Sequence, residues 1–150
     1  MPITGSATLW AVFAIVCALL VVKAQILGAA TAATRGKLKQ FLNAEDAQWL
    51  AGEHVKPDPE AVDRIARAHR NDLENLLPFF IGGTLFLSGR GPVSAGLAYF
   101  IIFLFARYLH SVAYLLRKPA LRRNAYTAGW LATLVLACHA AWSLAAAAWA

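Results

Sequence analysis

The stretch Arg67-Ala-His-Arg-Asn-Asp-Leu-Glu74 decides the fold, because it runs without a break into the apolar segment Leu76–Leu87. As a helix, that apolar segment spans about 18 Å, against roughly 30 Å for the hydrocarbon core of a bilayer. A helix that crosses a membrane here must carry about eight of the preceding polar residues into it. Ionisable groups at that depth are costly and persist where they face a bundle interior or a water-filled site, so the stretch predicts a functional site.

The composition of the whole chain also indicates a membrane protein. Of its 150 residues, 59% are hydrophobic, against about 45–50% in soluble domains. Four segments are long enough, or nearly so, to span a bilayer, which predicts an all-α, integral-membrane four-helix bundle that forms one domain over residues 1–150. The predicted spans cover residues 7–33, 61–88, 93–116 and 123–149. Asp58, Pro59 and Glu60 are expected as N-cap, N1 and N2 of the second helix.

The distribution of Lys and Arg predicts the orientation of these spans. Basic residues gather in the segments between spans one and two and between spans three and four: Arg35, Lys37, Lys39, Lys56, Arg64, Arg117, Lys118, Arg122 and Arg123. The N-terminal segment before Trp10 and the C-terminal tail have none, and the turn after span two has only Arg90. The positive-inside rule then places both termini on the outer or luminal side and both basic loops in the cytoplasm.

Acidic residues are confined to one part of the chain. All eight lie between Glu45 and Glu74, so the net charge of +6 resides in residues 75–150. Cys17 and Cys138 are single thiols within predicted spans and no CxxC occurs, which argues against a disulfide framework or a thiol-redox motif. We predict no metal site and no nucleic-acid partner.

Polar residues recur at helical spacing on three of the predicted helices. The sets are Arg67, Arg70, Asn71 and Glu74 on the second helix, Arg107, His110 and Tyr114 on the third, and Arg122 and Tyr126 on the fourth. Measured from the cytoplasmic ends, Glu74 lies about 20 Å along its helix and His110 about 10 Å, with Arg122 at the mouth. This predicts a pocket that is rich in arginine and open to the cytoplasm. Lys23 lies at a similar depth to Asp72 and Glu74 and could pair with either.

A ligand for such a pocket has carboxylates for the arginines and an amine for Glu74. Glutathione matches, with two carboxylates, one ammonium and one thiol. A free thiol with a pKa of about 8.5 is only about 3% ionised at pH 7, and lowering the pKa to about 6.5 raises this to about 75%. An arginine beside the thiol favours the thiolate in this way.

These residues carry a family resemblance. The chain resembles the MAPEG family, the membrane-associated proteins of eicosanoid and glutathione metabolism, and most of all its branch of microsomal glutathione transferase and microsomal prostaglandin E synthase. The resemblance rests on residues 67–80, 107–115 and 121–127, with a similar loop at residues 43–47, and its order and spacing cover nearly the whole chain.

The resemblance implies a homotrimer of four-helix subunits in a lipid membrane, with glutathione bound between neighbouring subunits near the cytoplasmic side. It implies glutathione contacts at Arg35, Arg70, Asn71, Glu74, His110 and Tyr114, beside which the helix-face pattern adds Arg67 and Arg107. It implies Arg122 as the catalytic arginine, with Tyr126 one turn on and Asp46 as its loop carboxylate. The chemistry it implies is attack of the glutathione thiolate on a lipophilic electrophile or hydroperoxide, that is, a glutathione transferase or peroxidase.

One departure from the synthase pattern keeps two alternatives open. Arg123 stands where the synthase has a serine, and the linker from Tyr114 to Arg122 is one residue shorter, so either arginine is a candidate for the thiolate. Three other functions are considered: an isomerase like the synthase, a non-catalytic lipid-binding scaffold, and a haem bundle ligated by His110 and His139. The absence of a Cys pair disfavours a dithiol–quinone oxidoreductase.

Overall fold

The computed structural model describes residues 5–149 and consists mainly of four long helices. The elements are α1 (Gly5–Leu38), β1 (Gln40–Phe41), α2 (Ala44–Trp49), β2 (Glu53–His54), α3 (Glu60–Ser88), α4 (Val93–Leu115) and α5 (Pro119–Ala148). The predicted all-α bundle is confirmed, and the short helix α2 and the two short parallel strands are additions to the four predicted helices. α1, α4 and α5 are long and apolar enough to cross a membrane. α3 carries the charged stretch quoted above, and its crossing stays a prediction.

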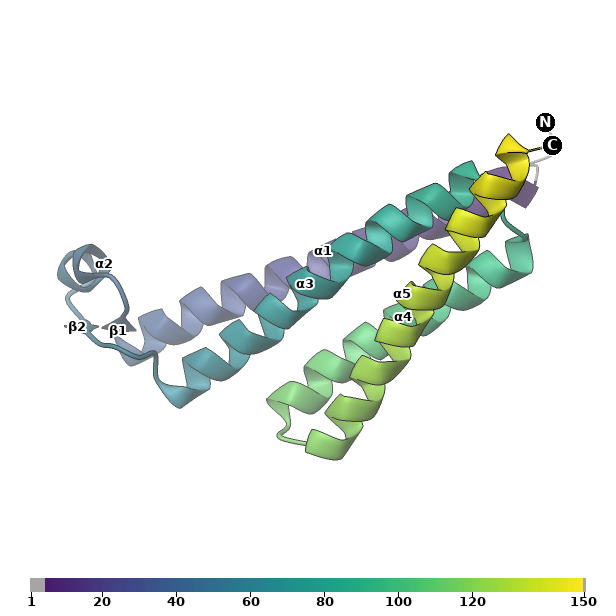
Figure 1. The fold of residues 1–150 in the computed structure, drawn as a ribbon. Helices are drawn as coiled ribbons and strands as arrows, with labels where there is room; N and C mark the ends of the chain where they lie inside the picture. Colours follow the sequence, from purple (N-terminus) through teal and green to yellow (C-terminus); the bar gives the residue numbers. More distant parts are fainter. Residues whose placement is uncertain (1–4, 150) are drawn as a thin grey trace.

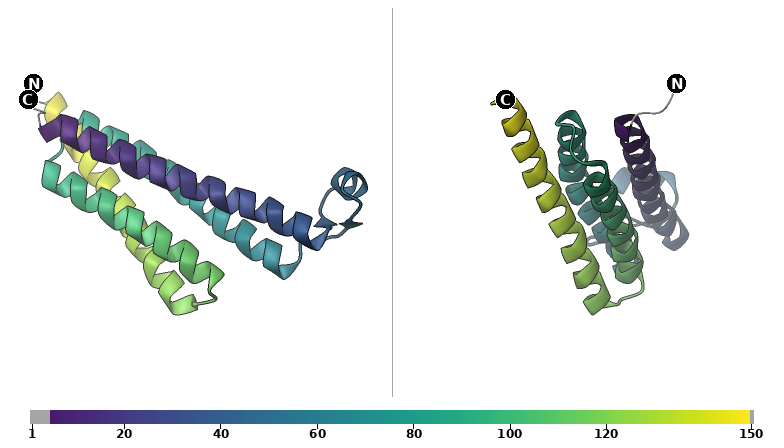
Figure 2. Two further views of the ribbon diagram at one scale, coloured as in Figure 1. Left: turned by 180° about the vertical axis from the view of Figure 1, so that it is seen from behind. Right: turned by 90° about the vertical axis from the view of Figure 1, so that its right-hand side faces the viewer.

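The helices form two pairs that meet at one end and diverge at the other. α1 runs beside α3 and α4 beside α5, and α3 and α4 lie between α1 and α5 (Figures 1 and 2). All four come together where the termini lie, whereas the α4–α5 loop and the far ends of α1 and α3 separate (Figure 1). The chain therefore has one closed half and one open half.

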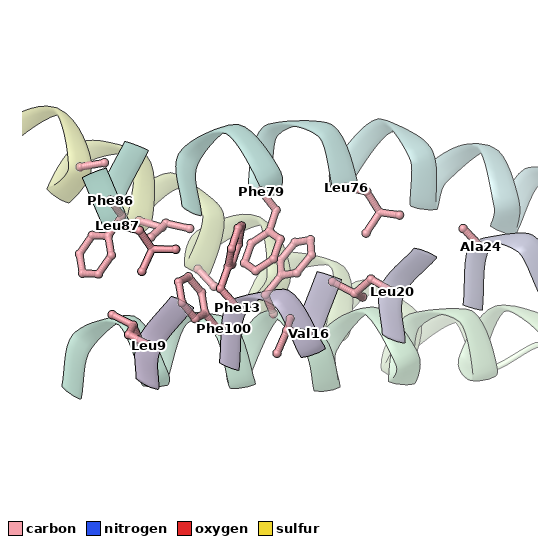
Figure 3. Packing of buried hydrophobic residues seen from close by; sticks show 14 residues of the cluster. Leu9, Phe13, Val16, Leu20, Ala24, Leu76, Phe79, Phe86, Leu87 and Phe100 are labelled. Carbon is pink, nitrogen blue, oxygen red and sulfur yellow. The ribbon is translucent and has the colours of Figure 1, made fainter. Parts of the chain in front are cut away.

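Aromatic packing closes the half near the termini. The rings of Phe79 and Phe103 are stacked with centroids 3.9 Å apart. The ring centroids of Phe13 and Phe100 lie 4.9 Å apart, next to Phe79 (Figure 3). α1 and α3 approach closely at Gly83, where an added Cβ would lie 2.3 Å from the Phe13 ring. Side chains from α1, α3 and α4 thus interdigitate, as dispersion-driven packing in lipid requires.

Residues 39–59 form a small folded arm beyond α1, where the sequence alone predicts a loop. Strands β1 and β2 pair in parallel, and Ala47 and Phe41 form a minimal core. Gly52 is needed here, because an added Cβ would lie 2.5 Å from the carbonyl oxygen of Lys39. The arm projects from the end of the α1–α3 pair (Figure 1).

Several predicted boundaries differ from those observed. α1 continues to Leu38, and α5 begins at Pro119, which suits the first turn because proline lacks only an N–H that is unpaired there. The N-cap of α3 is Pro59. The prediction of Asp58 as N-cap is wrong, because its carboxylate binds Arg35 instead.

Candidate functional site

Four of the predicted site residues gather where α4 and α5 lie side by side. The Arg122 guanidinium lies 4.6 Å from the ring centroid of Tyr114. The His110 ring lies 5.8 Å from that of Tyr114 and 6.2 Å from that of Tyr126. Each helix contributes two of these residues at i and i+4, so antiparallel packing brings the pairs together. The result is a cation over the face of one aromatic ring, Tyr114, at the start of a helix.

Arg122 and Arg123 differ in their surroundings. Arg122 is half-buried against Tyr114, whereas Arg123 is exposed. Both line a surface hollow of about 470 Å³ with Pro119 and Ala120. No ion pair within residues 5–149 involves Arg122. No acidic side chain in this part of the chain therefore neutralises its charge.

Arg107 lies deeper, in a buried polar cluster that we define as Lys23, Asp72, Arg107 and Ser111. The Arg107 side chain is 0% exposed and forms an ion pair with Asp72. Lys23 Nζ lies 2.7 Å from the other carboxylate oxygen of Asp72, so the structure selects Asp72 rather than Glu74 as its partner. Ser111 donates to the same oxygen at 3.2 Å. The expectation that Arg107 lines an open pocket is wrong for the single chain, because these contacts hold it inside the bundle.

Asn71 connects this cluster to the surface. Arg107 Nη2 donates to Asn71 Oδ1 at 3.0 Å, and Asn71 itself is half-buried. Two buried nitrogens nearby, Arg107 Nη1 and His110 Nδ1, have no hydrogen-bond partner in the described part of the chain. Unpaired buried donors and acceptors are rare and call for an explanation, of which a ligand is one.

The remaining predicted residues of α3 are exposed. Arg67 pairs with Asp63 at 2.8 Å on its own helix, as a solvated interfacial arginine does. Arg70 and Glu74 are exposed, and within residues 5–149 neither forms an ion pair. The four residues predicted to share one face are therefore divided, with Asn71 directed inward to Arg107.

Arg35 and Asp46 lie at the arm. Arg35 binds Asp58 through Nε at 3.0 Å and Nη2 at 2.6 Å. Asp46 is exposed and accepts from the side chain of Asn43 at 3.0 Å. Figure 1 and the left view of Figure 2 show the arm beyond the ends of α1 and α3, apart from the α4–α5 loop. One chain therefore does not bring Arg35 and Asp46 to Arg122.

The structure also separates the two histidines of the haem alternative. His139 Nδ1 lies 3.1 Å from the hydroxyl of Tyr99, and its ring packs on Phe86. Tyr99 precedes His110 by 11 residues on α4, which is about 16 Å along the helix. His110 and His139 thus lie at different depths and cannot bind the two faces of one haem.

Sequence reasoning missed Ser111. It lies one turn after Arg107, and the carbonyl oxygen of Arg107, 3.1 Å from its hydroxyl, is an alternative acceptor to Asp72 for its single hydrogen. Its i+4 spacing from a buried arginine was the one available signal.

Comparison with known proteins places this geometry in context. A family model described as the MAPEG family matches residues 13–142, which include every predicted site residue. Prostaglandin E synthase of Bos taurus is 39% identical over 137 residues, which cover 89% of this chain and 88% of that protein. The Homo sapiens prostaglandin E synthase is 37% identical with the same coverage. Microsomal glutathione S-transferase 1 of Rattus norvegicus is 39% identical over 124 residues, which cover 79% and 80%.

Proposed function

The chain belongs to the MAPEG family, and from this premise we propose that it is a membrane-embedded, glutathione-dependent transferase or peroxidase that acts on lipophilic electrophiles or hydroperoxides. The observation that carries the proposal is the Arg122 guanidinium, which has no ion-pair partner within residues 5–149 and lies over the Tyr114 ring beside His110 and Tyr126. Relatives named glutathione S-transferase and prostaglandin E synthase support the same chemistry.

The chemistry of the unpaired side chains fits glutathione. Arg70 offers a bidentate donor for a carboxylate, and Glu74 offers an acceptor for an ammonium. The Asn71 amide, which accepts from Arg107, and His110 Nδ1, which has no hydrogen-bond partner within residues 5–149, are further polar groups on α3 and α4. Bound glutathione supplies a thiolate nucleophile.

In this proposal Arg122 lowers the pKa of the bound thiol and so favours the thiolate. Its positive charge and the partial positive charge of the α5 N-terminus act at the same place. A shift of the thiol pKa by two units corresponds to roughly 2.7 kcal/mol of differential stabilisation. His110 and Tyr114 orient Arg122 through the aromatic stack, and Tyr126 adds a hydroxyl one turn further along α5.

We propose that the complete site forms between copies of the chain in a homotrimer. Arg35 lies in the last turn of α1, Asp46 in α2 of the arm and Arg122 near the start of α5. The end of α1 and the arm lie apart from the start of α5 (Figure 1), so a neighbouring copy is needed to add Arg35 and Asp46. In this arrangement Arg35 contacts glutathione and Asp46 pairs with Arg122. Lipophilic substrate reaches the site from the membrane between helices.

The proposed topology has both termini outside or luminal and the site near the cytoplasmic side. Its basis is the Lys and Arg asymmetry of the loops. Cysteines introduced at Lys37 and Lys118 are expected to react with an impermeant thiol reagent only after the cytoplasmic side is opened. Labelling from outside would reverse the orientation.

Two alternatives are decided by one experiment. An isomerase is supported by the relatives named prostaglandin E synthase, and a lipid-binding scaffold requires only the helices. Detergent-purified protein is assayed for glutathione binding by calorimetry and then with a substrate panel that separates conjugate formation, peroxide loss and endoperoxide isomerisation. Binding with conjugate or peroxide turnover supports the proposal, isomerisation alone supports the isomerase, and absence of glutathione binding leaves the scaffold.

A further inference from the structure

The carboxylate of Asp72 is the centre of the buried cluster and uses both of its oxygens. Oδ1 accepts from Arg107 Nε at 3.1 Å and from Arg107 Nη2, and Oδ2 accepts from Ser111 Oγ at 3.2 Å while lying 2.7 Å from Lys23 Nζ. Lys23 also donates to the backbone carbonyl of Arg107 at 2.9 Å. Side chains from α1, α3 and α4 therefore fix the position of one guanidinium.

Burying this cluster costs free energy, because its charged groups lose their contact with water. The three charged side chains are at most 8% exposed and carry two positive charges against one negative. Ionised groups in a membrane interior are retained where they serve a functional site. One hydrogen bond joins the cluster to a residue outside it: Arg107 Nη2 donates to Asn71 Oδ1.

That bond determines which way the Asn71 carboxamide faces. A guanidinium only donates, so the atom directed toward it must be the amide oxygen. The planar amide then turns Nδ2, with its two donor hydrogens, away from Arg107. Because Asn71 is half-buried, this donor edge lies toward the surface of α3.

We propose that Lys23 and Asp72 are positioning residues that hold Arg107, so that Arg107 orients the Asn71 amide toward glutathione. Arg107 thus acts through Asn71 and does not touch the ligand. The inference rests on the proposed function, since it assigns Asn71 a contact in that site. Its competitor is a direct contact through the unpaired Arg107 Nη1.

A double-mutant cycle separates action of Arg107 through Asn71 from direct contact of Arg107 with glutathione. Arg107→Lys keeps the positive charge beside Asp72, but a single ammonium cannot reproduce the fork that reaches Asp72 and Asn71 together. We measure the dissociation constant of glutathione by calorimetry for wild type, Arg107→Lys, Asn71→Ala and the double variant, on protein that elutes with the wild-type oligomer. Arg90→Lys, at the opposite end of the bundle, is the matched control.

The expected result is non-additive. Each single variant weakens glutathione binding by roughly tenfold, the scale of one hydrogen bond to a charged group, and Arg107→Lys adds less than about twofold in the Asn71→Ala background. Turnover at saturating glutathione stays within about threefold of wild type, because Arg122 is untouched. Additive losses would overturn the proposal in favour of direct contact. Wild-type protein that binds no glutathione would instead remove the proposed function.

Lys23→Met provides a second route if Arg107→Lys does not fold. It leaves a neutral Asp72–Arg107 pair and removes only the α1 support, so folding is retained. We expect glutathione binding to weaken by a few-fold, and the effect to vanish in the Asn71→Ala background. An equal effect in both backgrounds would show that Lys23 does not act through Asn71.

Discussion

The two halves of the bundle differ in how completely one chain closes them. Near the termini, Phe79 stacks on Phe103 in a core to which α1, α3, α4 and α5 all contribute, and Figure 3 shows Phe79 beside Phe13 and Phe100. Toward the α4–α5 loop the helix pairs diverge, and Arg70 and Glu74 are exposed (Figure 1). The first half is a finished scaffold, whereas the second holds the residues of the proposed glutathione site. Substitutions in the two halves should therefore have different kinds of effect.

The largest effect is expected for Arg122→Ala in the open half. Turnover should fall by about 10²–10³, the scale of losing one electrostatic stabiliser, while glutathione affinity stays within a few-fold because its carboxylate contacts lie elsewhere. The measurement is the thiolate absorbance of bound glutathione titrated against pH, together with turnover. The apparent pKa of the bound thiol should rise in the variant.

Arg123→Ala is the matched control for that experiment. Arg123 is exposed next to Arg122 and has the same charge. A raised thiol pKa in Arg123→Ala with none in Arg122→Ala would assign the thiolate to Arg123 and shift the correspondence with the family by one residue.

In the closed half, Phe79→Ala should act on stability alone. The ring is 0% exposed and contacts Phe13, Phe100 and Phe103. We expect a loss of about 2 kcal/mol, below the roughly 3–5 kcal/mol of soluble cores because the ring moves into lipid rather than water. The measurement is thermal unfolding in detergent. Leu77→Ala, on the exposed face of the same helix, should change little, and an equal loss there would contradict a self-contained core.

The sequence was sufficient to predict the helices and part of the site. The apolar runs set the number of helices, and the i, i+4 spacing of His110 with Tyr114 and of Arg122 with Tyr126 predicted their convergence. The partner of Lys23 could not be predicted. Asp72 and Glu74 are separated by about 200° around a helix, and packing decides which of them faces inward.

The arm shows a second limit of sequence reasoning. The pair between Arg35 and Asp58 joins residues 23 positions apart, across two short strands and a helix. No periodic pattern links such positions, so Asp58 was predicted as a helix cap from its local sequence. The Asp58 carboxylate pairs with Arg35 and so does not cap the helix.

A smaller effect is expected for Glu74→Gln, again in the open half. The exposed carboxylate has no ion-pair partner within residues 5–149, so its removal should not destabilise the chain. Glutathione binding should weaken by about tenfold, because the ligand ammonium loses a charged acceptor. Calorimetry measures the affinity and thermal unfolding provides the control. Unchanged affinity with lost stability would make Glu74 a structural residue at a subunit contact.

The smallest expected change in activity belongs to a test of whether a second copy completes the site in the open half. Arg35→Ala and Arg122→Ala should each lose activity at low glutathione, because one removes the arm contact and the other the thiolate arginine. When both variants are co-expressed in equal amounts and assemble at random, about one quarter of the sites that form between copies receive both wild-type arginines. Activity should therefore return to within about fourfold of wild type, measured against each variant expressed alone. A site built within one chain always contains one of the two substitutions, so activity that stays at the level of the single variants would contradict a shared site. Recovery would mean that Arg35 of one copy and Arg122 of another complete a single site.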